Sequence, residues 1–248
     1  MENIYMYHYT RLDCFLEIWA SKTLKFAHSS GLNDVNEVSK FYFGKHNPHG
    51  FTDTEALSEE VKSYKQISLT EETKNRYYSC LLPVMWGHYG GKGRGVCIRI
   101  DISKIKFSDK VFRRKVEYVK EIKPVTYDNS DIINFIIKHK KILFFTKTKD
   151  WSYEKEYRIV SKDEEFLDIS NAISEIIITS LFGMTNNYKD NGGIRSTLFN
   201  QVLKPMLPDN VKILEFCPNG LNGISLVDEK NNQIYPHNIN INNIDFSK

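Results

Sequence analysis

Residues 4–27, IYMYHYTRLDCFLEIWASKTLKFA, predict a strand, a helix and a second short strand in that order. The aromatic-rich run from Ile4 to Thr10 is typical of a β-strand. Residues 11–21 place apolar side chains at helical spacing, and Thr10 before them is a candidate N-cap. Residues 22–27 alternate polar and apolar side chains, which predicts a second, short strand.

The later elements alternate in kind without a regular strand–helix–strand rhythm. Strands are expected at 76–82, 96–100, 116–119, 124–127, 156–160, 173–180 and 211–216, with a hairpin over 223–235. Helices are expected at 53–64, 83–89, 131–145 and 191–207. This order predicts an α+β fold rather than a doubly wound parallel sheet. No linker divides the chain, so we expect a single domain over residues 1–236 and a loose, Asn-rich tail over 237–248.

Composition excludes several classes of protein. Of the 248 residues, 41% are hydrophobic and 26% are charged, which is not the composition of a disordered or collagen-like chain. No apolar run approaches the length of a membrane span, and the first residues lack the pattern of a signal peptide. We therefore expect a cytoplasmic protein with no membrane partner. The formal net charge of +3 permits a nucleic-acid partner without requiring one.

The known phosphate-loop and metal-site motifs do not fit. Residues 90–95, GGKGRG, lack the first glycine and the hydroxyl residue of a P-loop, so a helix-to-strand turn is the better interpretation. The four cysteines are far apart, and Pro48 disfavours the helix that would bring His46 and His49 together. We expect no metal cofactor.

Two basic stretches, residues 110–115 (KVFRRK) and 138–141 (KHKK) with Lys147 and Lys149, stand out in a chain of such mild net charge. Runs of this kind usually form solvated surface, and otherwise they contact phosphates. The sequence leaves both interpretations open.

Polar and aromatic side chains gather in three segments, residues 7–10, 86–89 and 147–158. In the last segment, strand alternation would put Glu154, Glu156 and Arg158 on one face of the sheet. Two close carboxylates raise the pKa of one of them, whereas a neighbouring arginine lowers it. A salt-bridged edge strand explains the same pattern without chemistry, and the aromatic residues of 86–89 also suit a hydrophobic core.

The order of these segments resembles a bacterial family, the domain of unknown function 2971. The resemblance rests on YHYT at 7–10, Asn33-Asp34 with Glu37, MWGHY at 85–89, GVC at 95–97 and WSYEKEYR at 151–158. It covers most of the chain, from Ile4 to Phe216. Val35 stands where the family usually has proline, and the family name implies no activity.

The opening strand with His-x-Thr, the helix and the second strand also look like the start of ADP-ribosyltransferases. That fold has mixed and antiparallel sheets with peripheral helices. Its first histidine and threonine hold NAD, a middle aromatic residue stacks on nicotinamide, and a glutamate that opens a late strand is catalytic. The resemblance therefore implies NAD as a substrate.

Carried over by position, the resemblance implies Glu156 as the catalytic residue, with Glu154 completing a Glu-x-Glu pattern. Strand register decides which of the two carboxylates faces the site, and the sequence leaves that open. The candidate cofactor-binding residues, from the carried-over positions and the same polar segments, are His8, Tyr9, Thr10, Asn33, Trp86, Tyr89 and Arg158.

The first functional hypothesis is an NAD-dependent ADP-ribosyltransferase-like enzyme that modifies a nucleic acid or a protein, as relatives in toxin or phage-defence settings do. Cleavage of the nicotinamide–ribose bond passes through an oxocarbenium-like transition state, which a carboxylate stabilises without a metal. The alternative is a non-catalytic module on the same fold that senses a nucleotide or a phage component. A metal-dependent nuclease is a distant third.

Overall fold

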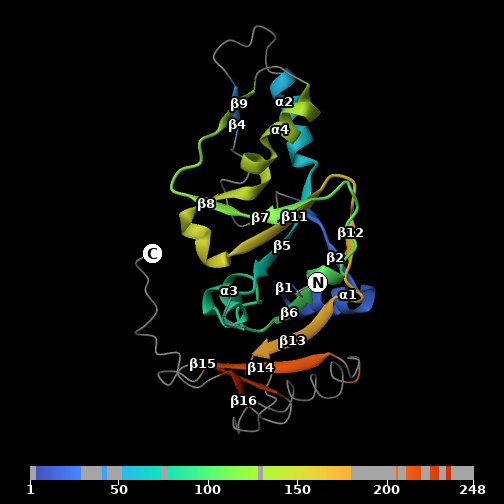
Figure 1. The fold of residues 1–248 in the computed structure, drawn as a ribbon, viewed down its shortest axis with the longest axis vertical. Helices are drawn as coiled ribbons and strands as arrows, with labels where there is room; N and C mark the ends of the chain where they lie inside the picture. The colour runs from blue at the N-terminus through green and yellow to red at the C-terminus, as the bar shows by residue number, and fades with distance from the viewer. Residues whose placement is uncertain are drawn as a thin grey trace. The chain divides into compact units, whose positions relative to one another are not determined.

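The computed structural model describes residues 4–28, 41–43, 52–73, 77–127, 131–179, 205, 211–218, 224–228 and 233–235. The chain divides into two compact units. Unit 1 comprises Met1–Lys22, Glu71–Ile105 and Ile169–Lys248, and unit 2 comprises Thr23–Thr70 and Lys106–Asp168. Each unit combines helices with β-sheet, so the predicted α+β class is confirmed (Figure 1). The single domain expected over 1–236 stays a prediction, and the tail 237–248 lies outside the described residues.

Unit 1 is built around a mixed sheet. Its strands are β1 (Tyr5–Thr10), β6 (Val96–Asp101), β13 (Ile173–Thr179), β14 (Lys212–Pro218), β15 (Ile224–Asp228) and β16 (Gln233–Tyr235), in the order β16-β15-β14-β13-β6-β1. Strands β13 and β14 are parallel, and the other neighbours are antiparallel. The unit also contains helices α1 (Leu12–Ser21) and α3 (Pro83–His88) and the 3₁₀ helices η2 (Tyr78–Cys80) and η3 (Ile102–Lys104). The hairpin predicted near the C-terminus is β15–β16.

The glycine-rich segment before β6 is the predicted helix-to-strand turn. Gly91 and Gly93 have φ of +58° and +76°, values that L-residues with side chains rarely adopt. Gly95 is required for a different reason, because a Cβ there would lie 2.1 Å from the carbonyl oxygen of Thr10. The backbone of β1 therefore approaches this turn too closely for any other residue.

The strand predicted over 76–82 is wrong. Among the described residues of this segment, Tyr77 has a φ of +71° and the 3₁₀ helix η2 follows it. Two side chains donate hydrogen bonds to backbone carbonyl oxygens here. The Tyr9 hydroxyl donates to the carbonyl oxygen of Ser79 at 2.5 Å, and the Trp86 indole donates to that of Cys80 at 2.8 Å. Because those carbonyls already have partners, the segment does not need the hydrogen bonds of a sheet.

Unit 2 contains a sheet ordered β5-β11-β7, with β3 also paired to β5. Its short ladders are β10–β8 and β4–β9, both parallel, and β12–β2, which is antiparallel. The strands are β2 (Thr23–Lys25), β3 (Ala27–His28), β4 (Phe41–Phe43), β5 (Lys65–Glu71), β7 (Phe112–Lys115), β8 (Glu117–Val119), β9 (Val125–Tyr127), β10 (Thr146–Thr148), β11 (Glu156–Ser161) and β12 (Phe166–Asp168). The helices are α2 (Thr52–Lys62), α4 (Ile132–Phe145) and the 3₁₀ helix η4 (Lys149–Glu154).

The core of unit 2 lies between α4, α2 and the sheet. Phe135, Ile136 and Phe145 of α4 are almost completely buried and pack with Leu57 of α2 and Val160 of β11. Helix α4 begins at the residue after Asp131, whose carboxylate accepts a hydrogen bond from the backbone N–H of Asn134. The helix predicted over 131–145 is therefore confirmed.

Other sequence-based predictions have mixed outcomes. The expected helices at 53–64 and 83–89 and the strands at 96–100, 156–160, 173–180 and 211–216 are confirmed within one or two residues over their described parts. Strands β5 and β7 were not predicted. The helix expected over 191–207 falls outside the described residues apart from residue 205. No helix in the described part of the chain is both long enough and apolar enough to cross a membrane.

Candidate functional site

The candidate site residues belong to both units. Unit 1 carries His8, Tyr9 and Thr10 on β1, Trp86 on α3 and Tyr89 just after it. Unit 2 carries Glu154 at the end of η4, and Glu156 and Arg158 on β11. Asn33 lies outside the described residues.

The three candidates of unit 2 form one buried ionic network with a residue that was not predicted. Arg158 donates from Nε to Oε1 of Glu156 at 2.8 Å and from Nη2 to Oε2 at 2.9 Å. The ammonium of Lys147 lies 2.8 Å from Glu154 Oε2 and 3.0 Å from Glu156 Oε2. All four side chains are less than 9% exposed. Two cations and two carboxylates therefore balance each other inside unit 2.

The strand ladder explains why Glu156 and Arg158 share a face. In the pairing of β11 with β5, Glu156 lies opposite Thr70 and Arg158 opposite Ser68. The third donor of Arg158, Nη1, reaches the carbonyl oxygen of Phe144 at 2.6 Å, at the end of α4. The sheet and the last turn of α4 thus fix the guanidinium, and the guanidinium fixes the carboxylate.

Glu154 reaches the network by a different route from the predicted one. Strand β11 starts at Glu156, and Lys155 before it has a φ of +45°, so the strand alternation predicted for 154–158 does not extend to Glu154. Glu154 ends the 3₁₀ helix η4, and Lys147 of β10 joins its carboxylate to that of Glu156. The prediction that Glu154 lies on the face of the strand is wrong, although its carboxylate contacts the same lysine.

The charges of the network keep Glu156 ionised. Burial by itself would raise the pKa of this carboxyl group, but the charges of Arg158 and Lys147 outweigh that effect. Hydrogen bonds from Arg158 and Ser68 add to it, and the pKa lies well below its ordinary range. Ser68 itself is exposed, so one hydrogen bond separates the ionised carboxylate from solvent.

The backbone and a tyrosine secure the start of β11. The backbone N–H of Glu156 donates to the hydroxyl oxygen of Tyr118, at 2.8 Å. The pKa of Tyr118 is raised, mainly by burial. Tyr118 belongs to β8, which pairs with the strand that carries Lys147. Elements β8, β10 and β11 therefore position the carboxylate together.

In unit 1, Tyr9 and Trp86 belong to the hydrophobic core. Their rings meet edge to face, with centroids 5.3 Å apart, and Trp86 is 2% exposed. Burial raises the pKa of Tyr9 strongly. Stacking of a ligand on Trp86 would require this core to open, whereas Tyr89 is half-buried and stands nearer to solvent. The assignment of these residues to NAD stays a prediction.

His8 and Thr10 lie two residues apart on the same face of β1 but are buried to different extents. His8 is half-buried, whereas Thr10 is 7% exposed and lies opposite Val96 of β6. The side chain of His8 has partners within the structure. The structure leaves the predicted roles of His8 and Thr10 in binding NAD untested.

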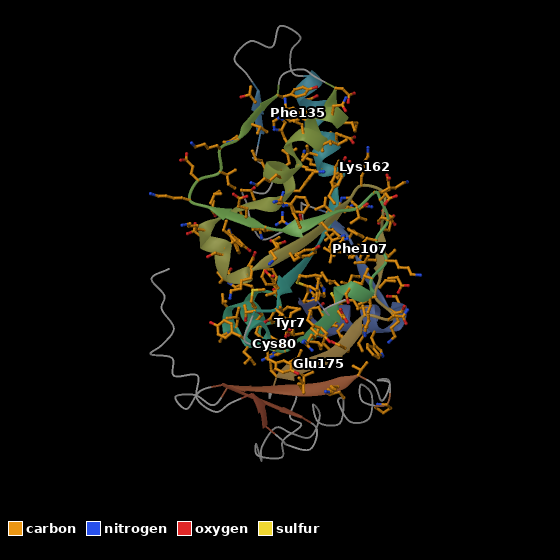
Figure 2. All side chains as sticks on the ribbon, in the orientation of Figure 1. Tyr7, Cys80, Phe107, Phe135, Lys162 and Glu175 are labelled. Carbon is orange, nitrogen blue, oxygen red and sulfur yellow. The ribbon has the colours of Figure 1, made fainter. Side chains whose placement is uncertain are left out.

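Unit 1 has a second buried ionic cluster, centred on Arg99, that the sequence did not indicate. Arg99 bonds Glu72 through Nε at 2.9 Å and Nη2 at 3.0 Å, and Glu175 through Nη1 at 3.2 Å. The hydroxyl of Tyr7 donates to Glu72 at 2.6 Å. Tyr7 and Glu175, labelled in Figure 2, come from β1 and β13. The cluster joins three segments of unit 1.

The sequence missed Lys147 and Ser68 for identifiable reasons. Lys147 belongs to a basic stretch whose composition is typical of solvated surface. Its burial depends on the pairing of β10 with β8. Ser68 lies in β5, a strand that was not predicted. Among the described residues, no group of three or more His, Cys, Asp or Glu side chains is arranged to hold a metal ion.

Comparison with known families gives a match over part of the chain. The family described as a protein of unknown function, DUF2971, matches residues 85–159. This match supports the predicted resemblance to DUF2971. It includes MWGHY, GVC and WSYEKEYR, and it leaves out YHYT and Asn33-Asp34. No curated protein and no solved structure matches the chain. The second resemblance, to ADP-ribosyltransferases, gains no support from these comparisons.

Proposed function

We propose that this chain is an NAD-dependent ADP-ribosyltransferase-like enzyme, with Glu156 as its catalytic carboxylate and a nucleic acid or a protein as acceptor. One observation carries the proposal. Glu156 opens a late strand, is held ionised by Arg158 and Lys147, and lies one hydrogen bond from the exposed Ser68.

An ionised, oriented carboxylate suits the chemistry of this reaction. Loss of nicotinamide leaves positive charge on the ribose, and a fixed negative group beside it stabilises the transition state. The ion pairs hold Glu156 in place before substrate binds, so little reorganisation is needed during the reaction. The cofactor contacts assigned from the sequence, among them His8, Thr10 and Tyr89, remain part of the proposal.

The test is the release of nicotinamide from NAD, measured by chromatography with and without cellular RNA, DNA and protein. Glu156→Gln is expected to lower the rate by about 10²–10³-fold, the usual cost of removing one electrostatic contact from a transition state. Glu154→Gln is the matched control, because it makes the same chemical change on the same lysine. A larger loss in Glu154→Gln would move the catalytic role to Glu154.

Folding must be separated from catalysis in this test. Glu156→Gln leaves Arg158 and Lys147 with less negative charge, so the thermal unfolding of each variant is measured beside its rate. A variant that stays folded and still binds NAD, seen as a rise in melting temperature, but releases no nicotinamide supports the catalytic role. Wild-type protein that neither binds nor cleaves NAD contradicts the proposal.

A second candidate, a non-catalytic nucleotide-sensing module, is favoured by the same contacts. Arg158 occupies both oxygens of Glu156, and Lys147 also contacts one of them. A carboxylate so fully engaged suits a structural role. This candidate predicts thermal stabilisation by a nucleotide without cleavage, unchanged by Glu156→Gln if that variant folds, and abolished by Tyr89→Ala.

A further inference from the structure

Strand β7 in unit 2 is an edge strand that carries three consecutive cations. It lies at the end of the order β5-β11-β7 and, among the described strands, pairs with β11. Arg113, Arg114 and Lys115 are all exposed. Residues 112–115 of the basic run are therefore a strand, and they present charge along the open edge of a sheet.

Helix α4 adds cations beside this edge. Lys140 lies over the ring of Phe112 in β7, with its ammonium 4.7 Å from the ring centroid. Lys141 forms a 2.6 Å ion pair with Glu117 at the start of β8. The second basic stretch of the sequence thus contacts the first at Phe112. Because side chains alternate along a strand, Arg114 shares the face of β7 that meets Lys140, and Arg113 and Lys115 lie on the opposite face. We name this group, Arg113, Arg114, Lys115, Lys140 and Lys141, the basic edge.

Aromatic rings, rather than carboxylates, orient two of these cations. The guanidinium of Arg113 lies 4.4 Å from the ring centroid of Phe107, a residue labelled in Figure 2, and Nη1 reaches the Tyr157 hydroxyl at 3.4 Å. Lys140 is placed in the same way by Phe112. A cation held on an aromatic face keeps its net charge, whereas one in a salt bridge has its charge largely compensated. These two cations are therefore oriented and still able to attract an anion.

The carboxylate of Glu117 lies beside the basic edge. The hydrogen bond and charge of Lys141 lower the pKa of Glu117, and Arg114 contributes to the same shift. Arg114 therefore attracts the Glu117 carboxylate electrostatically, and the same carboxylate forms an ion pair with Lys141. The five cations of the basic edge exceed the single negative charge of Glu117, so these six side chains together carry net positive charge.

We propose that the basic edge binds the phosphate backbone of a nucleic-acid strand. A nucleic-acid strand that runs along this open edge meets cations from both faces of β7, and the aromatic rings beneath Arg113 and Lys140 keep these two charges in position. This interface goes beyond the proposed function, because it stands whether or not the chain cleaves NAD. If the bound nucleic acid is also the acceptor of ADP-ribose, that part of the inference rests on the proposed function.

A different physical role could account for the same cations, because charged side chains on an edge strand also prevent sheets from pairing edge to edge. The two roles predict different measurements. A protective role predicts no affinity for nucleic acid and aggregation when the charges are removed. A binding role predicts affinity that falls with salt and with the number of cations.

The test is fluorescence anisotropy of labelled 20-nucleotide single-stranded RNA and DNA with the full chain, without NAD, between 50 and 200 mM salt. If all the cations of the basic edge contact phosphates, the slope of log K against log salt is about −3.5 for a single strand. Affinity would then fall about 100-fold across that range of salt. The double variant Arg113→Gln/Lys140→Gln is expected to reduce the slope to about −2.

The matched control is Lys25→Gln/Lys62→Gln, which removes two exposed charges from β2 and α2 of the same unit. Circular dichroism establishes that both double variants are folded. A reduced slope and weaker binding in Arg113→Gln/Lys140→Gln alone supports the proposal, and the RNA and DNA arms identify which strand binds. No binding at 50 mM salt, or equal losses in both double variants, overturns it. If the chain binds the labelled strand but releases no nicotinamide in the NAD assay, the proposed function is contradicted and the basic edge proposal is not.

Discussion

Replacing Arg158 with methionine tests the ionic network of unit 2 directly. The substitution keeps an unbranched side chain but removes both bonds to Glu156 and the bond to the Phe144 carbonyl. Glu156 then keeps Lys147 as a charged partner, 3.0 Å away, and Lys147 is shared with Glu154. The buried network changes from balanced charge to one excess negative charge.

Loss of one partner from a buried ion pair costs about 3–5 kcal/mol. Because Lys147 still compensates part of the charge, we expect about 3 kcal/mol for Arg158→Met, at the lower end of that range. The loss corresponds to a change of about 150-fold in the unfolding equilibrium. Urea denaturation followed by circular dichroism at neutral pH measures it.

The double variant Arg158→Met/Glu156→Met separates charge from packing. It leaves Lys147 and Glu154 as a balanced pair, 2.8 Å apart, so most of the lost stability should return. We expect the double variant to lie within about 1 kcal/mol of the wild type, apart from the cost of the unpaired Phe144 carbonyl. The reasoning is refuted if Arg158→Met costs less than about 1 kcal/mol, or if the two single losses simply add.

Further predictions concern pH, a glycine and a helix cap. The pKa of Glu156 is lower in the folded than in the unfolded protein, so its contribution to the free energy of unfolding is complete above the unfolded pKa of about 4.3 and is lost as the pH falls below that value. In urea titrations from pH 7 to pH 3, the free energy of unfolding should fall less in Glu156→Gln than in the wild type. Parallel curves for the two proteins would contradict this. Gly95→Ala brings a Cβ against the carbonyl of Thr10 and should cost about 1–3 kcal/mol by the same denaturation assay; a melting temperature equal to that of the wild type would show that β1 can move away. Asp131→Ala removes the cap on the N–H of Asn134 and should cost about 1 kcal/mol, with Asp131→Asn retaining most of the stability; equal losses in the two variants would mean that charge rather than the cap is responsible.

The sequence determined the kinds of element in this protein because local patterns carry that information. The helix expected over 131–145 matches α4 to within one residue, and the apolar, β-branched composition of 173–180 predicts β13. The glycine cluster fails the spacing of a phosphate loop and is a turn, as the sequence indicated. In each case, neighbours along the chain suffice to choose the conformation.

Tertiary structure decided the surroundings of the candidate carboxylates. The sequence identified Glu154, Glu156 and Arg158 but not Lys147, because nothing local distinguishes a buried lysine from a solvated one. The positive φ of Lys155 makes the strand begin at Glu156, later than alternation implied. The pairing of β10 with β8 buries Lys147 between two glutamates. Which charges neutralise one another depends on contacts between segments distant in the sequence, and local patterns do not encode those contacts.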